Sequence, residues 1–188
     1  MSNHTSTKRP NWAERIRICE FKGVNGFYDI LPLLADSNAF GNAMDDLVVL
    51  IDEGLGRSYS AEDEADLIVS TEARGFLFGP AIASYNNLGF VPVRKPGRTP
   101  GSTSTVNYGN EYGNDTLELQ NGLIKQGDRV IIVDDLIATG GTLEATAKMI
   151  EDQGGTVLEI ATLIELTELG GRKRLEAAGY KLYSVLQY

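Results

Sequence analysis

The chain has 188 residues, enough for one domain with a sizeable core, and its 42% hydrophobic and 23% charged residues exclude a disordered protein. Its 17 Lys and Arg against 26 Asp and Glu give a formal net charge of −9, which argues against a nucleic-acid-binding module with a clustered basic surface. Cys19 is the only cysteine and His4 the only histidine, which excludes an intramolecular disulfide, a multi-cysteine metal site and most histidine-dependent mechanisms.

Residues 1–15 are predicted to be a polar N-terminal tail. Its first eleven residues are rich in Ser, Thr, Asn, Lys and Arg, and no apolar segment of a targeting signal follows them. The longest apolar runs of the chain are also far too short to span a bilayer. We therefore expect a cytoplasmic protein with no membrane partner. We expect Cys19 to be either a small core residue or a bystander rather than a reactive thiol.

The first half of the chain alternates helix and strand patterns. Apolar residues recur at helical spacing from Phe40 to Ile51, and Asp36 or Ser37 is a suitable cap for this helix. The predicted elements that follow are a strand at Ala65–Ser70, a helix at Phe76–Leu88 and a strand at Gly89–Val93. Lys95–Asp115 then contains four glycines, two prolines and many Ser, Thr and Asn residues. This composition predicts a mobile functional loop, and a disordered linker between two domains is the alternative.

The second half continues the alternation. The predicted elements are strands at Arg129–Asp134, Thr156–Glu165 and Lys181–Leu186, and helices at Thr142–Gln153 and Glu168–Ala178. The β-branched run of the first of these strands is typical of a strand buried on both faces. Strands separated by helix-length segments indicate right-handed βαβ units around a parallel sheet. We therefore predict one α/β domain.

The segment Val130–Ala145 contains the clearest functional signal. A buried strand ends in Asp134 and Asp135, and Ala138-Thr139-Gly140-Gly141-Thr142 then leads into a helix. Glycines let successive backbone N–H groups converge on one anion, and the helix N-terminus adds a partial positive charge. Neither a Walker A loop nor a G-x-G-x-x-G dinucleotide fingerprint is present. The loop is therefore predicted to bind a phosphate group.

The two acids need a different partner, because they would repel a phosphate. Vicinal hydroxyls of a ribose, or a magnesium ion that bridges to them, suit a pair of groups that only accept hydrogen bonds. A turn in which the acids only cap and the glycines only bend the chain is the alternative, since a Gly-Gly turn alone is common. The combination of strand, acids, glycines and helix start favours a binding site.

This segment resembles the phosphoribosyl pyrophosphate signature of type I phosphoribosyltransferases. Other stretches are similar to the adenine phosphoribosyltransferase family in particular, and they are Ala73–Pro80 (ARGFLFGP), Val93–Arg98 (VRKPGR), Glu111-Tyr112-Gly113 with Leu117-Glu118, and Leu186–Tyr188. The resemblance runs from about Ile16 to Tyr188. It implies an α/β type I phosphoribosyltransferase fold over residues 16–188, with a central mainly parallel sheet, a small hood at about 16–35 and a mobile catalytic loop at about 97–115.

The resemblance also assigns roles to residues. Ala73, Arg74, Lys95, Arg94 and Arg98 would bind pyrophosphate, Ala138–Thr142 the 5-phosphate, and Asp134 and Asp135 the ribose hydroxyls. Mg²⁺ would be held mainly through the substrate, or directly by Asp134 and Asp135. Glu111 and Tyr112 would lie on a lid that excludes water from the reaction centre, with Arg74 as a further catalytic residue. With no histidine available there, Glu111 is the candidate for proton transfer at the base.

The base site is where the sequence departs from the family pattern. Gly26, Phe27, Tyr28 and Leu166 are the expected base contacts, with Phe27 and Leu166 on opposite faces of the purine. Tyr28 stands where the family has an Arg, and the usual Pro-Gly before it is absent. The expected reaction converts adenine and phosphoribosyl pyrophosphate to AMP and pyrophosphate in purine salvage.

Two alternatives to this function stay open. One is a type I enzyme for another base, such as a 6-oxopurine, and the other is a regulator that senses phosphoribosyl pyrophosphate. The resemblance further implies a homodimer. We expect small-molecule substrates and no nucleic-acid partner.

Overall fold

The computed structural model describes residues 9–55, 65–110 and 113–188. Within it the chain divides into two compact units, residues 1–46 and 47–188, and the boundary falls inside one long helix, α2 (Ser37–Gly54). The first unit contains the 3₁₀ helix η1 (Asn11–Arg15), the hairpin β1 (Arg17–Phe21) and β2 (Val24–Asp29), and the short helix α1 (Leu31–Leu34). These elements precede α2 in the chain.

Local contacts explain how the first unit folds. The Asp36 carboxylate accepts the Ala39 N–H at 3.1 Å, which caps α2 as the sequence predicted. The Trp12 indole donates to the Asp46 carboxylate at 2.7 Å and ties η1 to this helix. Cys19 is exposed on β1, a strand whose residues are all exposed, so of the two expected roles the core residue is excluded and the bystander remains.

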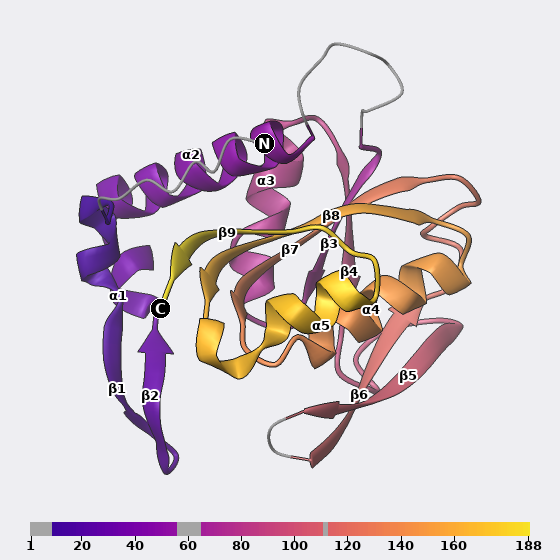
Figure 1. Cartoon of the computed structure of the whole chain (residues 1–188). Helices are drawn as coiled ribbons and strands as arrows, with labels where there is room; N and C mark the ends of the chain where they lie inside the picture. The colour runs from indigo at the N-terminus through magenta and orange to yellow at the C-terminus, as the bar shows by residue number, and fades with distance from the viewer. Residues whose placement is uncertain (1–8, 56–64, 111–112) are drawn as a thin grey trace. The chain divides into compact units, whose positions relative to one another are not determined.

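A five-stranded parallel sheet forms the centre of the second unit (Figure 1). Its order is β4-β3-β7-β8-β9, and the bounds of the strands are β3 (Leu67–Thr71), β4 (Gly89–Val93), β7 (Arg129–Ile137), β8 (Thr156–Glu165) and β9 (Leu182–Gln187). Every neighbouring pair in it is parallel, which confirms the predicted βαβ architecture. The carboxyl ends of these strands share one edge, where parallel sheets bind ligands.

The helices of this unit are shorter than predicted. Phe76–Leu88 was expected to be one helix, but the structure has η3 (Gly75–Leu77) and α3 (Gly79–Tyr85), with Pro80 in the first turn of α3. Glu168–Ala178 is likewise divided into η4 (Thr167–Leu169) and α5 (Gly171–Ala177), because Gly170 takes a positive φ of 72°. Only α4 (Gly141–Asp152) matches its predicted range closely.

The Gly-rich segment differs most from the prediction. Much of it forms the antiparallel ribbon of β5 (Thr103–Asn110) and β6 (Gly113–Gln120), paired from Thr103 with Gln120 to Asn110 with Gly113. The sequence did not indicate these strands, because Thr, Ser and Asn without apolar alternation are also typical of loops. An isolated bridge between Arg94 and Glu118 joins β6 to the end of β4. The mobility of this ribbon stays a prediction.

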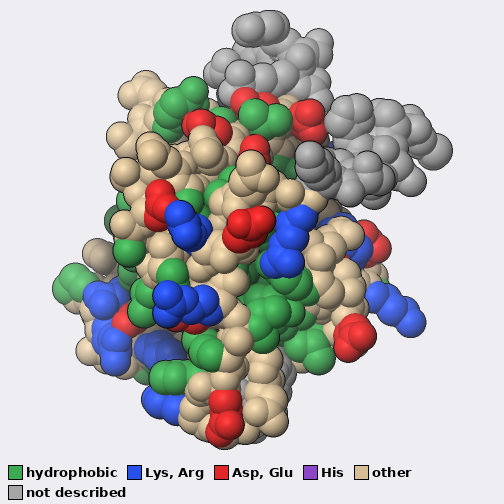
Figure 2. All heavy atoms as spheres, turned by 90° about the vertical axis from the view of Figure 1, so that its left-hand side faces the viewer, with side chains coloured by type: hydrophobic (Ala, Val, Ile, Leu, Met, Phe, Trp, Pro, Cys, Tyr) green, Lys and Arg blue, Asp and Glu red, His purple; other side chains and the backbone are tan. Residues whose placement is uncertain are grey.

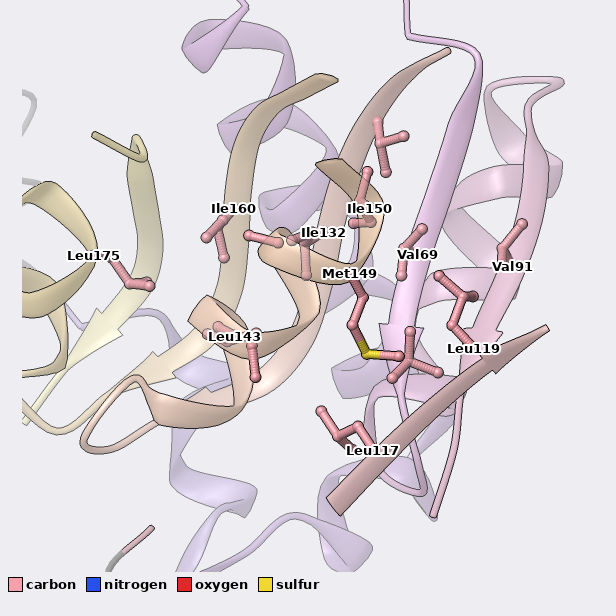
Figure 3. Close-up of a cluster of buried hydrophobic side chains, with 14 of the residues drawn as sticks. Val69, Val91, Leu117, Leu119, Ile132, Leu143, Met149, Ile150, Ile160 and Leu175 are labelled. Atoms are coloured by element: carbon pink, nitrogen blue, oxygen red, sulfur yellow. The ribbon is translucent and has the colours of Figure 1, made fainter. Parts of the chain in front are cut away.

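The core lies between one face of the sheet and α4 (Figure 3). Leu143, Met149 and Ile150 of α4 pack toward Val69 and Ile132 on the strands, and all are nearly or fully buried. Leu117 and Leu119 of β6 close one side of this cluster, which explains why the ribbon lies against the domain despite its polar composition. Burying this apolar surface is the main stabilising contribution to the unit.

The described surface shows mixed charge. On the face in Figure 2, basic and acidic side chains lie among one another around an area of hydrophobic side chains. Within the described ranges, no helix combines the length and the apolar character needed to cross a membrane.

Candidate active site

The predicted phosphate loop follows β7 and enters α4. Gly140 has a φ of 79°, and a Cβ built there would lie 3.0 Å from the Gly171 carbonyl oxygen. A Cβ on Gly141 would lie 2.6 Å from the Gly109 carbonyl oxygen of β5. Both positions therefore need glycine. Gly140 has a positive φ and lies close to Gly171, whereas Gly141 only lies too close to Gly109 for a side chain. The turn places the N-terminus of α4, a ready-made anion site, at the carboxyl edge of the sheet.

A cavity of about 370 Å³ opens over this loop. Most of the predicted phosphate, ribose and pyrophosphate residues line it, and they are Ala73, Arg74, Lys95, Asp134, Asp135 and Ala138–Thr142. Other lining residues come from the strand ends and the ribbon, including Thr71, Glu72, Tyr108, Asp115 and Leu117. The structure thus brings three separate sequence motifs to one site.

The two acids on β7 are buried and tightly held. Asp134 accepts a short hydrogen bond from the Thr71 hydroxyl and, at 2.8 Å, the backbone N–H of Asp135. Burial and the neighbouring charge of Asp135 raise the pKa of Asp134 well above its usual range. Burial also raises the pKa of Asp135, against the opposing charge of Arg74. Since Asp134 is occupied by protein donors, Asp135 is the better placed of the two to accept a ligand hydroxyl.

Arg74 and Asp135 are in direct contact in the cavity wall. The Arg74 Nε lies 2.9 Å from Asp135 Oδ2, and the two groups form an ion pair. The same oxygen accepts no hydrogen bond within the described residues. Arg74 therefore pairs with a residue 61 positions away rather than with its sequence neighbour Glu72. The guanidinium is about a third exposed and suits a polyanionic ligand.

The cations after β4 divide into two groups. Lys95 lines the cavity, with its Nζ 3.8 Å from the Asp115 carboxylate of β6. Arg94 and Arg98 instead form ion pairs with the buried carboxylate of Glu72 and are not among the lining residues. Burial would raise the pKa of Glu72, but the Lys95 N–H and the Arg98 and Arg94 guanidinium groups lower it overall. A role of Arg94 and Arg98 in pyrophosphate binding stays a prediction.

The expected base contacts come from two separate parts of the chain. Leu166 follows β8, and its N–H donates to the carbonyl of the lining residue Ile137 at 2.9 Å, which places it beside the cavity wall. Gly26, Phe27 and Tyr28 lie on β2 of the first unit, where Phe27 packs against Phe21 with ring centroids 4.9 Å apart. Their contact with a base stays a prediction. Glu111 and Tyr112 lie outside the described residues.

Sequence reasoning missed Thr71, Tyr108 and Asp115. Thr71 ends β3, and its position after a buried strand was an available signal, because neighbouring parallel strands end at the same edge. Tyr108 accepts a hydrogen bond from the Thr142 hydroxyl at 3.2 Å and so joins the ribbon to the phosphate loop. Nothing in the local sequence indicates this contact, which depends on the pairing of β5 and β6.

Comparison with known proteins bears on this site. A family model described as a phosphoribosyl transferase domain matches residues 40–184. Adenine phosphoribosyltransferase of Clostridium beijerinckii is 46% identical over 177 residues, which cover 93% of this chain and 96% of that protein. The chain belongs to the adenine phosphoribosyltransferase family. The Desulfitobacterium hafniense adenine phosphoribosyltransferase is 48% identical over 162 residues, covering 86% and 87% of the two chains.

Solved structures of adenine phosphoribosyltransferases agree with this assignment. The enzyme of Thermoanaerobacter pseudethanolicus superposes with a TM-score of 0.83 at 43% identity, covering 94% of this chain and 98% of that one. The Saccharomyces cerevisiae enzyme, solved with adenine and an imino-altritol bisphosphate, has a TM-score of 0.82 at 34% identity over 93% and 98% of the two chains. These matches confirm the type I phosphoribosyltransferase fold and place this chain among the transferases.

Proposed function

We propose that this member of the adenine phosphoribosyltransferase family transfers the 5-phosphoribosyl group of phosphoribosyl pyrophosphate to adenine in purine salvage. The bond from C1 of the ribose to pyrophosphate breaks, a bond from C1 to a ring nitrogen of adenine forms, and that nitrogen loses its proton. AMP and pyrophosphate are the products. The observation that carries this proposal is the cavity that joins the phosphate loop, Asp135 and Arg74 in a chain 43–48% identical to adenine phosphoribosyltransferases.

Different residues of the cavity wall would bind different parts of the substrate. The loop Ala138–Thr142 and the N-terminus of α4 offer backbone N–H groups and the Thr139 hydroxyl for the 5-phosphate. Asp135 accepts ribose hydroxyls, with Asp134 held behind it by Thr71. Arg74 and Lys95 supply positive charge for the departing pyrophosphate. Positioning and charge stabilisation thus come from separate parts of the cavity wall.

The donor set also fits a magnesium ion that the substrate carries. No group of three or more His, Cys, Asp or Glu in the described parts of the chain is arranged to hold a metal. Two buried carboxylates beside a phosphate site nevertheless suit a hard cation whose remaining ligands are phosphate oxygens and water. Asp135 would hold the ion, and the bound ion would neutralise charge on the pyrophosphate as it leaves.

The finer parts of the proposal rest on the resemblance. Glu111 would take the proton from the base, and the ribbon of β5 and β6 would close over the site and exclude water.

The protein is expected to be a homodimer in the cytoplasm. Size-exclusion chromatography with light scattering measures the molar mass, and a monomer at assay concentration would contradict the dimer.

A panel of bases tests the function. Purified protein is assayed with Mg²⁺, phosphoribosyl pyrophosphate and adenine, hypoxanthine, guanine or uracil, and nucleotide products are separated by chromatography. We expect AMP from adenine and at least about a hundredfold lower kcat/KM with hypoxanthine, a difference of roughly 2.7 kcal/mol. Formation of another nucleotide in place of AMP would transfer the assignment to another base. No turnover with any base would contradict an enzyme.

A further inference from the structure

Glu118 is a buried glutamate beside the active site that the proposed reaction does not use. It lies on β6 between Leu117 and Leu119, and only 4% of it is exposed. Leu117 and Asp115 of the same strand line the cavity, whereas Glu118 does not. A charged group in such a position needs partners that compensate for its lost hydration.

Three backbone N–H groups of one turn are those partners. Glu118 Oε2 accepts the Gly97 N–H at 2.9 Å, and Oε1 accepts the Arg98 and Thr99 N–H groups at 2.8 and 2.6 Å. The Thr99 side chain and these three backbone groups lower the pKa of Glu118, so the ionised form is the one that the turn binds. The carboxylate therefore holds a turn whose residues are otherwise largely exposed.

This turn belongs to the segment that carries Lys95. Arg94 and Glu118 also exchange two backbone hydrogen bonds, at 2.9 and 2.8 Å, so β6 is fastened to the segment just before and just after Lys95. On the other side, the Lys95 N–H donates to Glu72 at 3.3 Å, and Arg98 forms an ion pair with the same carboxylate. The side chain of Lys95 thus lines the cavity, and the backbone on either side of it is held by Glu118 and Glu72.

We propose that Glu118 is a positioning residue for the pyrophosphate half of the substrate, acting through the backbone that carries Lys95. This inference rests on the proposed function of the cavity and adds a residue to it. Glu118 does not line the cavity and would touch no reacting atom. Glu118 would keep the Lys95 ammonium in place before the substrate binds. The conformational entropy of this segment is then lost on folding and does not weaken substrate binding.

The test compares three variants with the wild type. Glu118→Gln replaces one acceptor oxygen with an NH₂ group that faces backbone donors, and Glu118→Asp keeps the charge on a shorter side chain. Glu159→Gln is the matched control, because Glu159 is equally buried on β8 but lies six positions before the carboxyl end of that strand. The measurements are steady-state kinetics for both substrates, calorimetric affinity for magnesium pyrophosphate, and hydrogen exchange of the Gly97, Arg98 and Thr99 amides.

We expect Glu118→Gln to raise the KM for phosphoribosyl pyrophosphate and the Kd for magnesium pyrophosphate about tenfold, with the KM for adenine within twofold. Glu118→Asp should give an intermediate effect and Glu159→Gln none. An unchanged pyrophosphate affinity in folded Glu118→Gln, or equal increases in both KM values, would overturn the proposal. If neither Glu118 variant folds, the wild-type exchange decides: slow exchange of the three amides supports the proposal and exchange at the rate of a free peptide refutes it. Pyrophosphate affinity needs no turnover, so it separates this inference from a failure of the adenine assignment.

Discussion

Gly140 and Gly141 both disfavour a side chain, but for different reasons. Gly140 combines a positive φ with the nearby carbonyl of Gly171, and Gly141 faces the backbone of β5. Gly122 offers a comparison, since it has a φ of 82° but no atom within 4 Å of its would-be Cβ. The two kinds of constraint can therefore be measured separately.

Gly140→Ala and Gly122→Ala form a matched pair. Both should lose roughly 1–2 kcal/mol of folding stability, because an L-residue is disfavoured at positive φ. Only Gly140→Ala should also raise the KM for phosphoribosyl pyrophosphate, by about tenfold or more, since its Cβ displaces the phosphate loop from Gly171. Urea unfolding and steady-state kinetics give the two quantities. Similar kinetics in both variants would show that the loop adapts to the added methyl group.

β8 carries a buried carboxyl group outside the active site, that of Glu159. Glu159 is 1% exposed, and a Cβ on Gly54, at the end of α2, would lie 2.3 Å from its Oε2. Neither carboxyl oxygen has a hydrogen-bond partner among the described residues. Burial raises the pKa of Glu159 to about 8, with Lys181 opposing and Asp52 adding to the shift. The folded state therefore favours the protonated carboxyl at neutral pH.

The pH dependence of stability follows from this shift. Between about pH 5 and pH 8 the folded Glu159 binds a proton that the unfolded chain has released, so folding stability falls as the pH rises through this range. Glu159→Gln lacks the titration, and the wild type should lose roughly 3–4 kcal/mol of folding stability relative to it between these pH values. Urea unfolding of both proteins at pH 5, 6.5 and 8 measures the difference. Parallel pH profiles would contradict a raised pKa.

The whole molecule carries a net charge of −9 and is proposed to bind a highly anionic substrate. Screening limits distant exposed charges to about a Debye length, whereas backbone N–H groups, Arg74 and Lys95 act within the cavity. Local geometry therefore decides binding here rather than the sign of the total charge. The net charge retains an effect on solubility and on the approach of ligands.

Ligand-induced stabilisation tests this division of the cavity. At a hundredfold excess over its Kd, phosphoribosyl pyrophosphate with Mg²⁺ should add about 2.7 kcal/mol, or roughly 5–10 °C in Tm. Ribose 5-phosphate at the same concentration should give a smaller shift, because it leaves Arg74 and Lys95 unused. In Arg74→Gln the shift with phosphoribosyl pyrophosphate should fall toward that with ribose 5-phosphate. Equal shifts for both ligands in the wild type, measured by differential scanning fluorimetry, would exclude the assigned pyrophosphate site.

The parallel α/β sheet and the phosphate loop could be predicted from the amino-acid sequence, because both depend on patterns within a few residues: apolar strands, helical spacing, and two acids followed by glycines at a helix start. The tertiary structure alone decided the pairings of Thr71 with Asp134 and of Arg74 with Asp135, which join residues more than 60 positions apart. The tertiary structure also shows that Thr103–Asn110 and Gly113–Gln120 pair as a ribbon, since polar strands are specified by their partner rather than by their own composition. Glu118 belongs to this second group, because its proposed role depends on a turn that the bridge between Arg94 and Glu118 brings within reach of its carboxylate.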